Sequence, residues 1–417
     1  MTKLNLRTRN GVVGAVDIGT TKICCFIAQI DENGPRITGI GHQVAKGMRN
    51  GVIVDIEAAS RSILHAVHTA EEMAGTTLND VVINISGGYG ASRLVKAELA
   101  LNGREVSDGL LNRVLDQGHR IKDAPDRTLV HSIPVGFSID GGRSLRDPRG
   151  LFGQKLAVNM NIVTASFGAV RNLSNCVARC HLETAAIVVS PYASGLSCLV
   201  DDESDLGVTV IDMGGGTTTI GVFFDGNLVF ADSVPIGGSH VTNDIARGLS
   251  TPIAQAERMK TLYGNAIASS ADEREMITVP LVGEDDDGHA NHVPRSLLVG
   301  VIAPRMEETF ELVRDRLEAS GFDKITGRRV VLTGGASQLP GARELAGLIL
   351  DKQVRVGRPL RIDGLAESTQ GPAFATTAGL IHFALSERAE VPRRGRALTE
   401  QSNGLIGRLG LWVREYL

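Results

Sequence analysis

The sequence predicts an α/β protein made of two similar domains that face each other across a cleft. Three glycine-rich turns carry this prediction: one near the N-terminus, one near the middle of the chain and one near residue 334. Each turn follows an apolar run rich in β-branched residues, which is typical of a buried strand. Two of the turns share one pattern and lie about half the chain apart, so the sequence indicates a duplicated unit.

The middle turn begins at Asp212, which closes the apolar run of residues 208–211. After it come Gly214, Gly215, Gly216 and Thr217. Three glycines let the backbone approach a ligand closely and turn several amide N–H groups toward one point, an arrangement that binds phosphate. A carboxylate cannot face phosphate directly, so we expect a hydrated Mg²⁺ ion between Asp212 and the phosphate.

The first turn repeats this pattern, with Asp17 closing the strand. The residues that follow Ile18 are Gly19, Thr20, Thr21 and Lys22. We expect the two hairpins to hold the β- and γ-phosphates of a nucleotide from opposite sides, and Asp17 to share the hydrated Mg²⁺ with Asp212. A single glycine-rich hairpin is as often an ordinary turn, so it is the second copy that favours a nucleotide clamp.

The third turn is Gly334-Gly335, which follows the apolar run of residues 330–332 and precedes a predicted helix over 340–350. Adjacent glycines leave no side chain over the turn, so a flat base or ribose can lie against the backbone. We therefore expect Gly334, Gly335, Ala336 and Gln338 to contact adenosine.

In this order the three turns resemble the phosphate-1, phosphate-2 and adenosine motifs of the actin, heat-shock chaperone and sugar kinase superfamily. The resemblance implies a two-domain, actin-like ATPase clamp, which is a duplicated ribonuclease H-like fold, with ATP and Mg²⁺ as ligands. It also implies that Glu257 and Lys260 lie near the ribose or adenine. A solvated helix face is the alternative for these two residues.

Composition excludes several classes of protein. The 417 residues suffice for two to four subdomains, and the net charge of −4 excludes a general basic face for nucleic acid. No apolar run approaches the length of a membrane span, and the first residues lack the apolar core of a signal peptide. The five cysteines lack paired metal-ligand spacing, so we expect reduced thiols.

Residues 86–166 read as an inserted small domain. The pattern predicts strands over 94–101, 129–139 and 157–164, and a helix that begins after Ser107. This segment has no catalytic spacing, so it is either purely structural or a protein-contact module. Outside it, helices are predicted over 57–74, 170–181, 240–248, 254–263 and 296–320, and a strand over 184–189 leads to a crossover helix that begins at Pro191.

The C-terminal stretch differs from the rest of the chain. Residues 387–403 are polar and read as a flexible linker. In a helix over 404–417, one face would carry Leu405, Ile406, Leu409, Trp412, Val413, Tyr416 and Leu417. Arg408 and Arg414 would lie opposite, a pattern typical of a helix that lies in the surface of an anionic membrane. A helix docked on its own protein or a coiled-coil partner helix is the alternative.

Over its whole length the chain resembles the FtsA family of bacterial cell-division proteins. The residues that carry this resemblance are the three turns, the segments 47–51 and 147–151, and the C-terminal helix. The resemblance implies subdomain IA over 1–85 and 167–200, an inserted subdomain IC over 86–166, subdomain IIA over 201–237 and 304–386, and subdomain IIB over 238–303. The linker and the membrane-targeting helix complete the chain.

This resemblance also implies a function. The expected protein assembles into actin-like filaments and anchors FtsZ to the cytoplasmic side of the inner membrane at the division site, as a peripheral membrane protein. FtsZ would bind subdomain IIB through its C-terminal tail, and later division proteins would bind subdomain IC. Candidate cations for FtsZ are Arg247, Arg258, Arg295 and Arg305, although the acidic run 284–287 argues against a uniformly basic surface.

Hydrolysis of ATP is expected to be slow. Related clamps carry a Glu or Gln in the crossover between the domains, whereas this chain has Ser190 there. ATP would then act mainly as an assembly ligand. One competing interpretation is a pilus-assembly actin-like ATPase, which the C-terminal helix disfavours. A second is a small-molecule kinase, for which we find no catalytic carboxylate in the inserted domain. A third is a polymerising shape protein of the MreB type, which has a different domain at this place.

Overall fold

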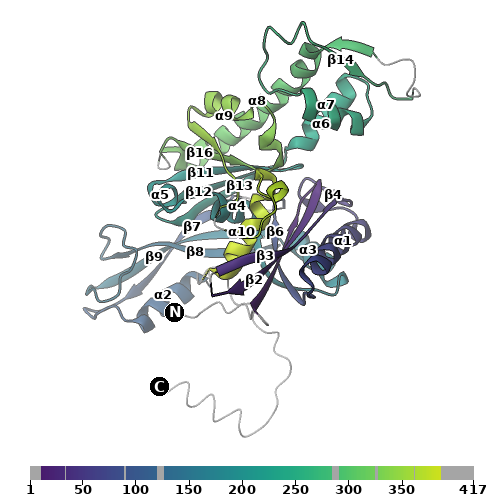
Figure 1. Cartoon of the computed structure of the whole chain (residues 1–417). Coiled ribbons are helices and arrows are strands. Elements are labelled where there is room, and N and C mark those ends of the chain that lie inside the picture. The colour runs from purple at the N-terminus through teal and green to yellow at the C-terminus, as the bar shows by residue number, and fades with distance from the viewer. Residues whose placement is uncertain are drawn as a thin grey trace.

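The computed structural model describes residues 11–386 except 33, 89–90, 120–125, 284–290, 325–326 and 361. The acidic run 284–287, the predicted linker and the predicted C-terminal helix lie outside the described residues. Figure 1 shows two sheet-containing lobes, an inserted subdomain beside them and a helical subdomain at the far end.

The first lobe is built on a five-stranded sheet in the order β10-β6-β1-β2-β3. Its strands are β1 (Val12–Ile18), β2 (Lys22–Asp31), β3 (Gly34–Val44), β6 (Asp80–Ile85) and β10 (Glu183–Val189). The first three are antiparallel, whereas β6 and β10 run parallel to β1. Helices α1 (Ile56–Ala74) and α3 (Phe167–Arg179) pack against each other beside this sheet, and α1 covers β3.

The second lobe repeats this topology. Its sheet has the order β13-β12-β11-β16-β17, with β11 (Val208–Met213), β12 (Thr218–Phe224), β13 (Asn227–Val234), β16 (Arg329–Thr333) and β17 (Gln353–Val356). Again the first three strands are antiparallel and the last two run parallel to the first. The duplication that the two aspartate turns predicted is therefore confirmed, and each aspartate lies near the end of the equivalent strand.

Two helices, α4 (Ser190–Cys198) and α10 (Ala375–Leu385), cross between the two sheets, at the centre of Figure 1. They touch at Gly379, where an added Cβ would meet the carbonyl oxygen of Ala193 at 1.7 Å, so only glycine allows this approach. Nearly every residue of both helices is buried, and Leu380, Ile381 and Phe383 belong to the hydrophobic core of the first lobe.

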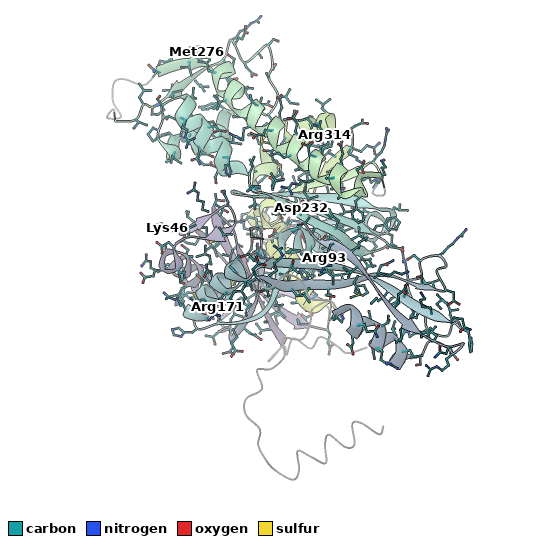
Figure 2. All side chains as sticks on the ribbon, turned by 180° about the vertical axis from the view of Figure 1, so that it is seen from behind. Lys46, Arg93, Arg171, Asp232, Met276 and Arg314 are labelled. Atoms are coloured by element: carbon teal, nitrogen blue, oxygen red, sulfur yellow. The ribbon has the colours of Figure 1, made fainter. Side chains whose placement is uncertain are left out.

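The inserted subdomain forms a sheet in the order β7-β9-β8, from β7 (Arg93–Ala100), β8 (Arg127–Ile139) and β9 (Lys155–Ser166), with helix α2 (Asp108–His119). The chain enters it from the first lobe, yet it also docks on the second. Ser92 exchanges two 2.8 Å hydrogen bonds with the backbone of Ala231, and Asn161 Nδ2 donates to the carbonyl of Leu228 at 2.9 Å. Figure 2 shows this side of the molecule, with Arg93 on β7 and Asp232 on β13 labelled.

The remaining subdomain lies above the second sheet in Figure 1. It contains α6 (Gly238–Gly248), α7 (Ile253–Tyr263), the hairpin of β14 (Met276–Val279) and β15 (Asn291–Pro294), and the first half of α8 (Arg295–Ser320). The rest of α8 packs with α9 (Ala342–Leu350), so the predicted division between residues 303 and 304 falls within one helix. Short elements complete the fold: β4 (Met48–Arg49), β5 (Val52–Ile53), α5 (Asp201–Leu206), η2 (Phe322–Lys324), η3 (Gly335–Gln338), η4 (Glu367–Thr369) and η5 (Pro372–Phe374).

Several helix starts differ from the prediction by a few residues, and for two of them the local structure gives the cause. Helix α3 begins at Phe167 rather than near residue 170, because the hydroxyl of Ser166 caps it by accepting a hydrogen bond from the amide of Ala169. Helix α9 begins at Ala342 rather than at Pro340, because the chain first makes the 3-10 turn η3 after the glycine pair.

Candidate functional site

Two adjoining cavities lie between the lobes, one of about 950 Å³ and one of about 180 Å³. Thr20, Thr21, Gly214, Gly215 and Gly335 line both of them. The smaller cavity is further lined by Asp17, Gly19, Lys22, Asp212, Thr217 and Gly334, and the larger one by Glu257, Lys260, Ala336 and Gln338. The structure thus brings the predicted residues together around one continuous space, with the exception of Gly216.

Gly216 has a different role, which is to let the two hairpins touch. An added Cβ at Gly216 would meet the Thr20 side chain at 2.5 Å, and one at Gly215 would meet Thr21 at 2.5 Å. The glycines of one hairpin therefore face the threonines of the other. The threonine hairpin is supported in turn by Gly51, whose amide donates to Thr20 Oγ1 at 2.9 Å.

The two aspartates line the smaller cavity, and neighbouring polar groups bind each carboxylate. Asp17 accepts hydrogen bonds from Asn84 Nδ2 at 2.7 Å and from Thr377 Oγ1 at 3.4 Å. Asp212 accepts from the hydroxyls of Ser194 and Thr376, the latter at 2.8 Å. Helix α10 therefore contributes one threonine to each aspartate.

Burial raises the pKa of both carboxylates. It raises the pKa of Asp17 to about 6, and the charge of Lys22 is the largest effect that opposes this rise. Burial also raises the pKa of Asp212, although its hydrogen bonds with Ser194 and Thr376 act in the other direction. Two acids that resist ionisation in this way would be stabilised in their charged form by a nearby cation.

The residues present fit a magnesium ion that keeps most of its water ligands, rather than one coordinated by protein groups alone. In the part of the chain that the structure describes, no group of three or more His, Cys, Asp or Glu residues could hold a metal. Mg²⁺ keeps several waters and commonly binds through one or two carboxylates together with substrate phosphates. Asp17 and Asp212 supply two carboxylates in the lining of the smaller cavity.

The larger cavity has a polar wall on α7. Lys260 Nζ donates to Glu257 Oε2 at 2.7 Å, to Thr242 Oγ1 at 2.9 Å and to the carbonyl of Gly238 at 3.2 Å. Glu257 also accepts a hydrogen bond from the hydroxyl of Thr242. This network joins α7 to the start of α6, directly above the second glycine hairpin.

Sequence reasoning missed four polar residues that support the site: Asn84, Ser194, Thr376 and Thr377. Each is buried, and together they bind both aspartates. Asn84 also accepts a hydrogen bond from the amide of Ile18 and donates to Ser190 Oγ at 3.0 Å. Two features of the sequence could have indicated them. Asn84 is a lone amide in the apolar run of residues 81–85, and Thr376 and Thr377 are a threonine pair in an apolar helix.

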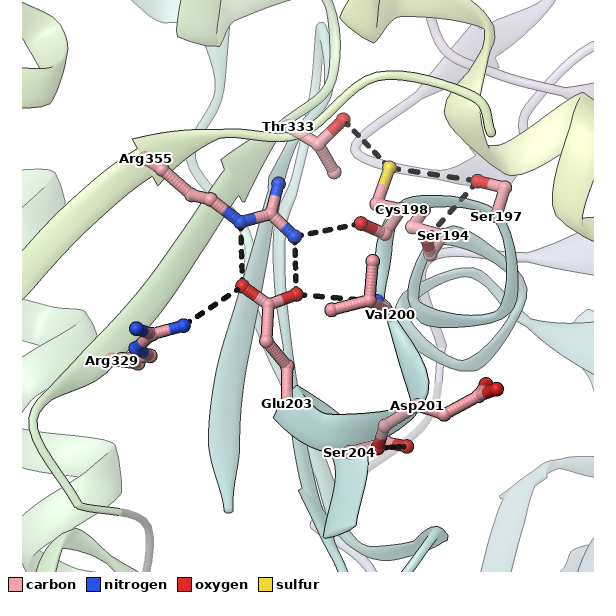
Figure 3. A network of polar contacts seen from close by, with 10 residues as sticks. All are labelled: Ser194, Ser197, Cys198, Val200, Asp201, Glu203, Ser204, Arg329, Thr333 and Arg355. Atoms are coloured by element: carbon pink, nitrogen blue, oxygen red, sulfur yellow. Dashed lines mark hydrogen bonds and ion pairs between the residues drawn. The ribbon is translucent and has the colours of Figure 1, made fainter. Parts of the chain in front are cut away.

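Behind the third turn, a polar network fixes the end of α4 to the second sheet (Figure 3). Glu203 on α5 receives two hydrogen bonds from Arg355 of β17, at 2.7 and 2.5 Å. Arg355 also donates to the carbonyl of Cys198 at 2.8 Å, and the side chain of Cys198 contacts Thr333 Oγ1. Since Thr333 precedes Gly334, this network supports the turn expected to contact adenosine.

Comparison with known proteins places this fold and site in a family. A sequence profile described as "Cell division protein FtsA" matches residues 209–379, and one described as "SHS2 domain inserted in FTSA" matches residues 87–164. The cell division protein FtsA of Rhizobium meliloti is 46% identical over 420 residues, which cover 98% of this chain and 95% of the relative. The chain belongs to the FtsA family.

The cell division protein FtsA of Escherichia coli is 31% identical, with 98% of each chain covered, so the similarity to FtsA extends to more distant relatives. Among solved structures, a PilM-PilN type IV pilus biogenesis complex matches with a TM-score of 0.62 at 18% identity, covering 90% of this chain and 98% of that one. MreB5 of Spiroplasma citri bound to ADP matches with a TM-score of 0.52 at 13% identity, covering 89% and 95%.

These structural neighbours show an actin-like ATPase fold. They share that fold at low identity, whereas the FtsA relatives match nearly the whole sequence. The pilus-assembly and kinase interpretations are therefore not favoured. Within the described residues, no helix combines the length and the apolar character that crossing a bilayer requires.

Proposed function

We propose that this FtsA protein binds Mg²⁺-ATP in the cleft and assembles into filaments that attach FtsZ to the membrane. The observation that carries the nucleotide part is the pair of aspartate hairpins that face each other across the smaller cavity, which opens into a space large enough for a nucleoside. The ADP-bound state of MreB5, a neighbour of the same fold, supports this proposal.

Different residues bind the phosphates and the nucleoside. Backbone amides of both hairpins and the ammonium of Lys22 bind the phosphates, while Gly334, Gly335 and Ala336 lie against the nucleoside. Bound Mg²⁺ offsets the negative charge of the phosphates. Asp17 and Asp212 would hold the hydrated ion, and a threonine of α10 binds each of these carboxylates.

The nucleotide site is tested by Gly215→Asp. A Cβ at this position already meets Thr21 at 2.5 Å, so the aspartate would separate the hairpins and place a negative charge where phosphate binds. We expect the affinity for Mg²⁺-ATP, measured by titration calorimetry, to fall at least about tenfold. Gly300→Asp is the matched control, because an added Cβ at Gly300 on α8 meets nothing within 4 Å. Unchanged ATP affinity in Gly215→Asp would contradict the site.

ATP hydrolysis is proposed to be slow. Ser190 begins α4, where related clamps carry a water-orienting Glu or Gln, and its hydroxyl is held by Asn84. The carboxylates that line the smaller cavity are the two aspartates assigned to Mg²⁺. Without a general base a reaction typically loses about 10²–10⁴-fold in rate. Steady-state turnover above roughly 1 s⁻¹, an ordinary enzymatic rate, would contradict this proposal.

Membrane attachment is assigned to the C-terminal helix, residues 404–417, which lie outside the described part of the chain. Burial of its seven apolar side chains and the attraction of its two arginines to anionic lipid favour binding. The conformational entropy that the segment loses when the helix forms opposes binding. One copy should therefore bind marginally, whereas a filament with many copies should bind tightly through avidity.

Vesicle binding tests this assignment. Trp412 is the one tryptophan of the chain, so its fluorescence reports on the helix alone. Anionic vesicles should shift that emission to the blue, and the protein should sediment with them more strongly when ATP is present. Trp412→Glu and a chain that ends at Asn403 should remain in the supernatant. If emission is unmoved and the shortened chain still sediments, the helix is not the anchor.

The FtsZ tail is proposed to bind subdomain IIB, and later division proteins subdomain IC. Two of the candidate cations are already paired within the protein: Arg295 with Asp272 and Glu275, and Arg305 with Asp244 and Glu308. This leaves Arg247 and Arg258 as the stronger candidates. Charge reversal at both should remove FtsZ from the vesicle pellet while the variant protein itself still sediments. If replacing the inserted subdomain removes FtsZ instead, the assignment is wrong.

A further inference from the structure

Lys22, the basic residue of the first phosphate hairpin, is held by a segment from the far end of the sequence. Its ammonium lies 3.4 Å from the centre of the Phe374 ring. Its Nζ also donates a 2.7 Å hydrogen bond to the carbonyl oxygen of Ala373. Two consecutive residues of η5 thus fix the position of one cation.

Both of these partners are uncharged. A carboxylate in their place would neutralise the ammonium, whereas a carbonyl oxygen and the face of an aromatic ring attract it and leave its charge intact. A lysine ammonium has three N–H donors, and Ala373 uses one of them. The remaining donors belong to a group that lines the smaller cavity, so they are available to an anion between the hairpins.

The Phe374 ring is itself fixed on two sides. It stacks on Phe26 with centroids 6.1 Å apart and an interplanar angle of 12°, and it meets His42 edge-on at 6.3 Å. The rest of η5 is tied to the third turn, since the carbonyl of Pro372 accepts hydrogen bonds from the amide of Gly334 and the hydroxyl of Thr333. The ring therefore has one defined orientation beneath Lys22.

We propose that Phe374 is a positioning residue for phosphate binding: its ring, with the neighbouring carbonyl, holds the charged Lys22 between the two hairpins, ready for the terminal phosphates of a nucleoside triphosphate. This inference rests on the proposed nucleotide site and adds a residue to it. It also predicts which ligands are affected. Loss of the ring should weaken ligands with a phosphate tail and spare those without one.

A double-mutant cycle on the full chain tests the proposal. The variants are Phe374→Leu, Lys22→Met and the double variant, with Phe374→Tyr as a matched control that keeps the ring. Titration calorimetry measures the affinity for Mg²⁺-ATP and for adenosine, and thermal melting confirms that each variant folds. If Phe374→Leu fails to fold, Phe374→Met serves as the ring-free variant.

We expect Phe374→Leu to weaken Mg²⁺-ATP binding about three- to tenfold, as the loss of a cation–π contact at a partly desolvated site implies. Phe374→Tyr should stay within about twofold of the wild type, and adenosine affinity should be unchanged. In the Lys22→Met background the substitution should have no further effect. An equal loss in that background, or an equal loss for adenosine, would show that Phe374 acts only by packing. If the wild type binds no Mg²⁺-ATP, the proposed function itself fails, which is a separate result.

Discussion

His131 is a fully buried imidazole that joins the inserted subdomain to the crossing helices. Its Nε2 accepts a hydrogen bond from the amide of Val189 at 3.1 Å, directly before α4. The rings of Tyr192 and Phe383 pack edge-on against it at 5.3 and 5.9 Å. Within the described residues its Nδ1 has no hydrogen-bond partner, so the ring is neutral and enclosed. Burial lowers the pKa of His131 from its ordinary value of 6.5 to about 3.

This shift predicts a loss of stability in acid. Between pH 6.5 and pH 3 the unfolded chain binds a proton at His131 that the folded chain does not bind, so unfolding is favoured as the pH falls. Neutral His131 costs the folded protein no stability above pH 6.5. At pH 3 the free energy of unfolding could be lower by up to about 5 kcal/mol. His131→Phe removes the titrating group and keeps an aromatic ring, and should therefore reduce the acid sensitivity.

The measurement is the urea midpoint of both proteins at pH 7, 5.5 and 4. At pH 7 the variant should be less stable by about 1–3 kcal/mol, because the amide of Val189 loses its acceptor. This difference should narrow toward pH 4. A difference that is constant over the three pH values would show that His131 titrates with its ordinary pKa in the folded protein.

At the scale of single elements, the glycine hairpins could be predicted and their supports could not. Asp212 and its glycines lie within a few residues of each other, so their local pattern is sufficient to indicate a phosphate-binding turn. Thr377, by contrast, reaches Asp17 from 360 positions away, and no local pattern links them. The same holds for Phe374 and Lys22. The contacts that could not be predicted are those between side chains that are far apart in the sequence and that only the fold brings together.

The short helix α5 depends on the ion pair between Glu203 and Arg355. Glu203 is 6% exposed, and its carboxylate also lies 3.7 Å from Arg329 of β16. Glu203→Gln keeps the shape and removes the charge that Arg355 faces. Breaking a fully buried pair costs about 3–5 kcal/mol. Since the Arg355 side chain is 40% exposed, we expect a smaller loss of roughly 1–3 kcal/mol, seen as a lower melting temperature.

Glu344→Gln is the matched control for this prediction. Glu344 pairs with Arg343 on α9, but both side chains are about half exposed, and such pairs contribute between about 0 and 1 kcal/mol. The control should melt like the wild type. Equal melting temperatures for Glu203→Gln and Glu344→Gln would mean that the network in Figure 3 does not stabilise the end of α4.

At the scale of the whole molecule, the described fold is complete at residue 386. Helix α10 fills the core of the first lobe, where Ala378, Leu380 and Ile381 are fully buried. A chain that ends after residue 386 should therefore melt within a few degrees of the full chain and bind Mg²⁺-ATP equally well. A chain that ends after Phe374 should not fold, since it lacks the helix that supports both aspartates. Cooperative melting of this shorter chain would contradict the assignment of α10 to the core.

The place of α10 also determines when during protein synthesis the first lobe can fold. Strands β1, β2 and β6 leave the ribosome early, but α10, which packs against them, is made last of all the described elements. At about 5–20 residues per second, tens of seconds separate the two events. During this time the apolar face of the nascent sheet stays uncovered and is open to chaperones. Products of interrupted translation should therefore be recognised as unfolded and degraded, and only chains that extend through α10 should acquire a nucleotide site.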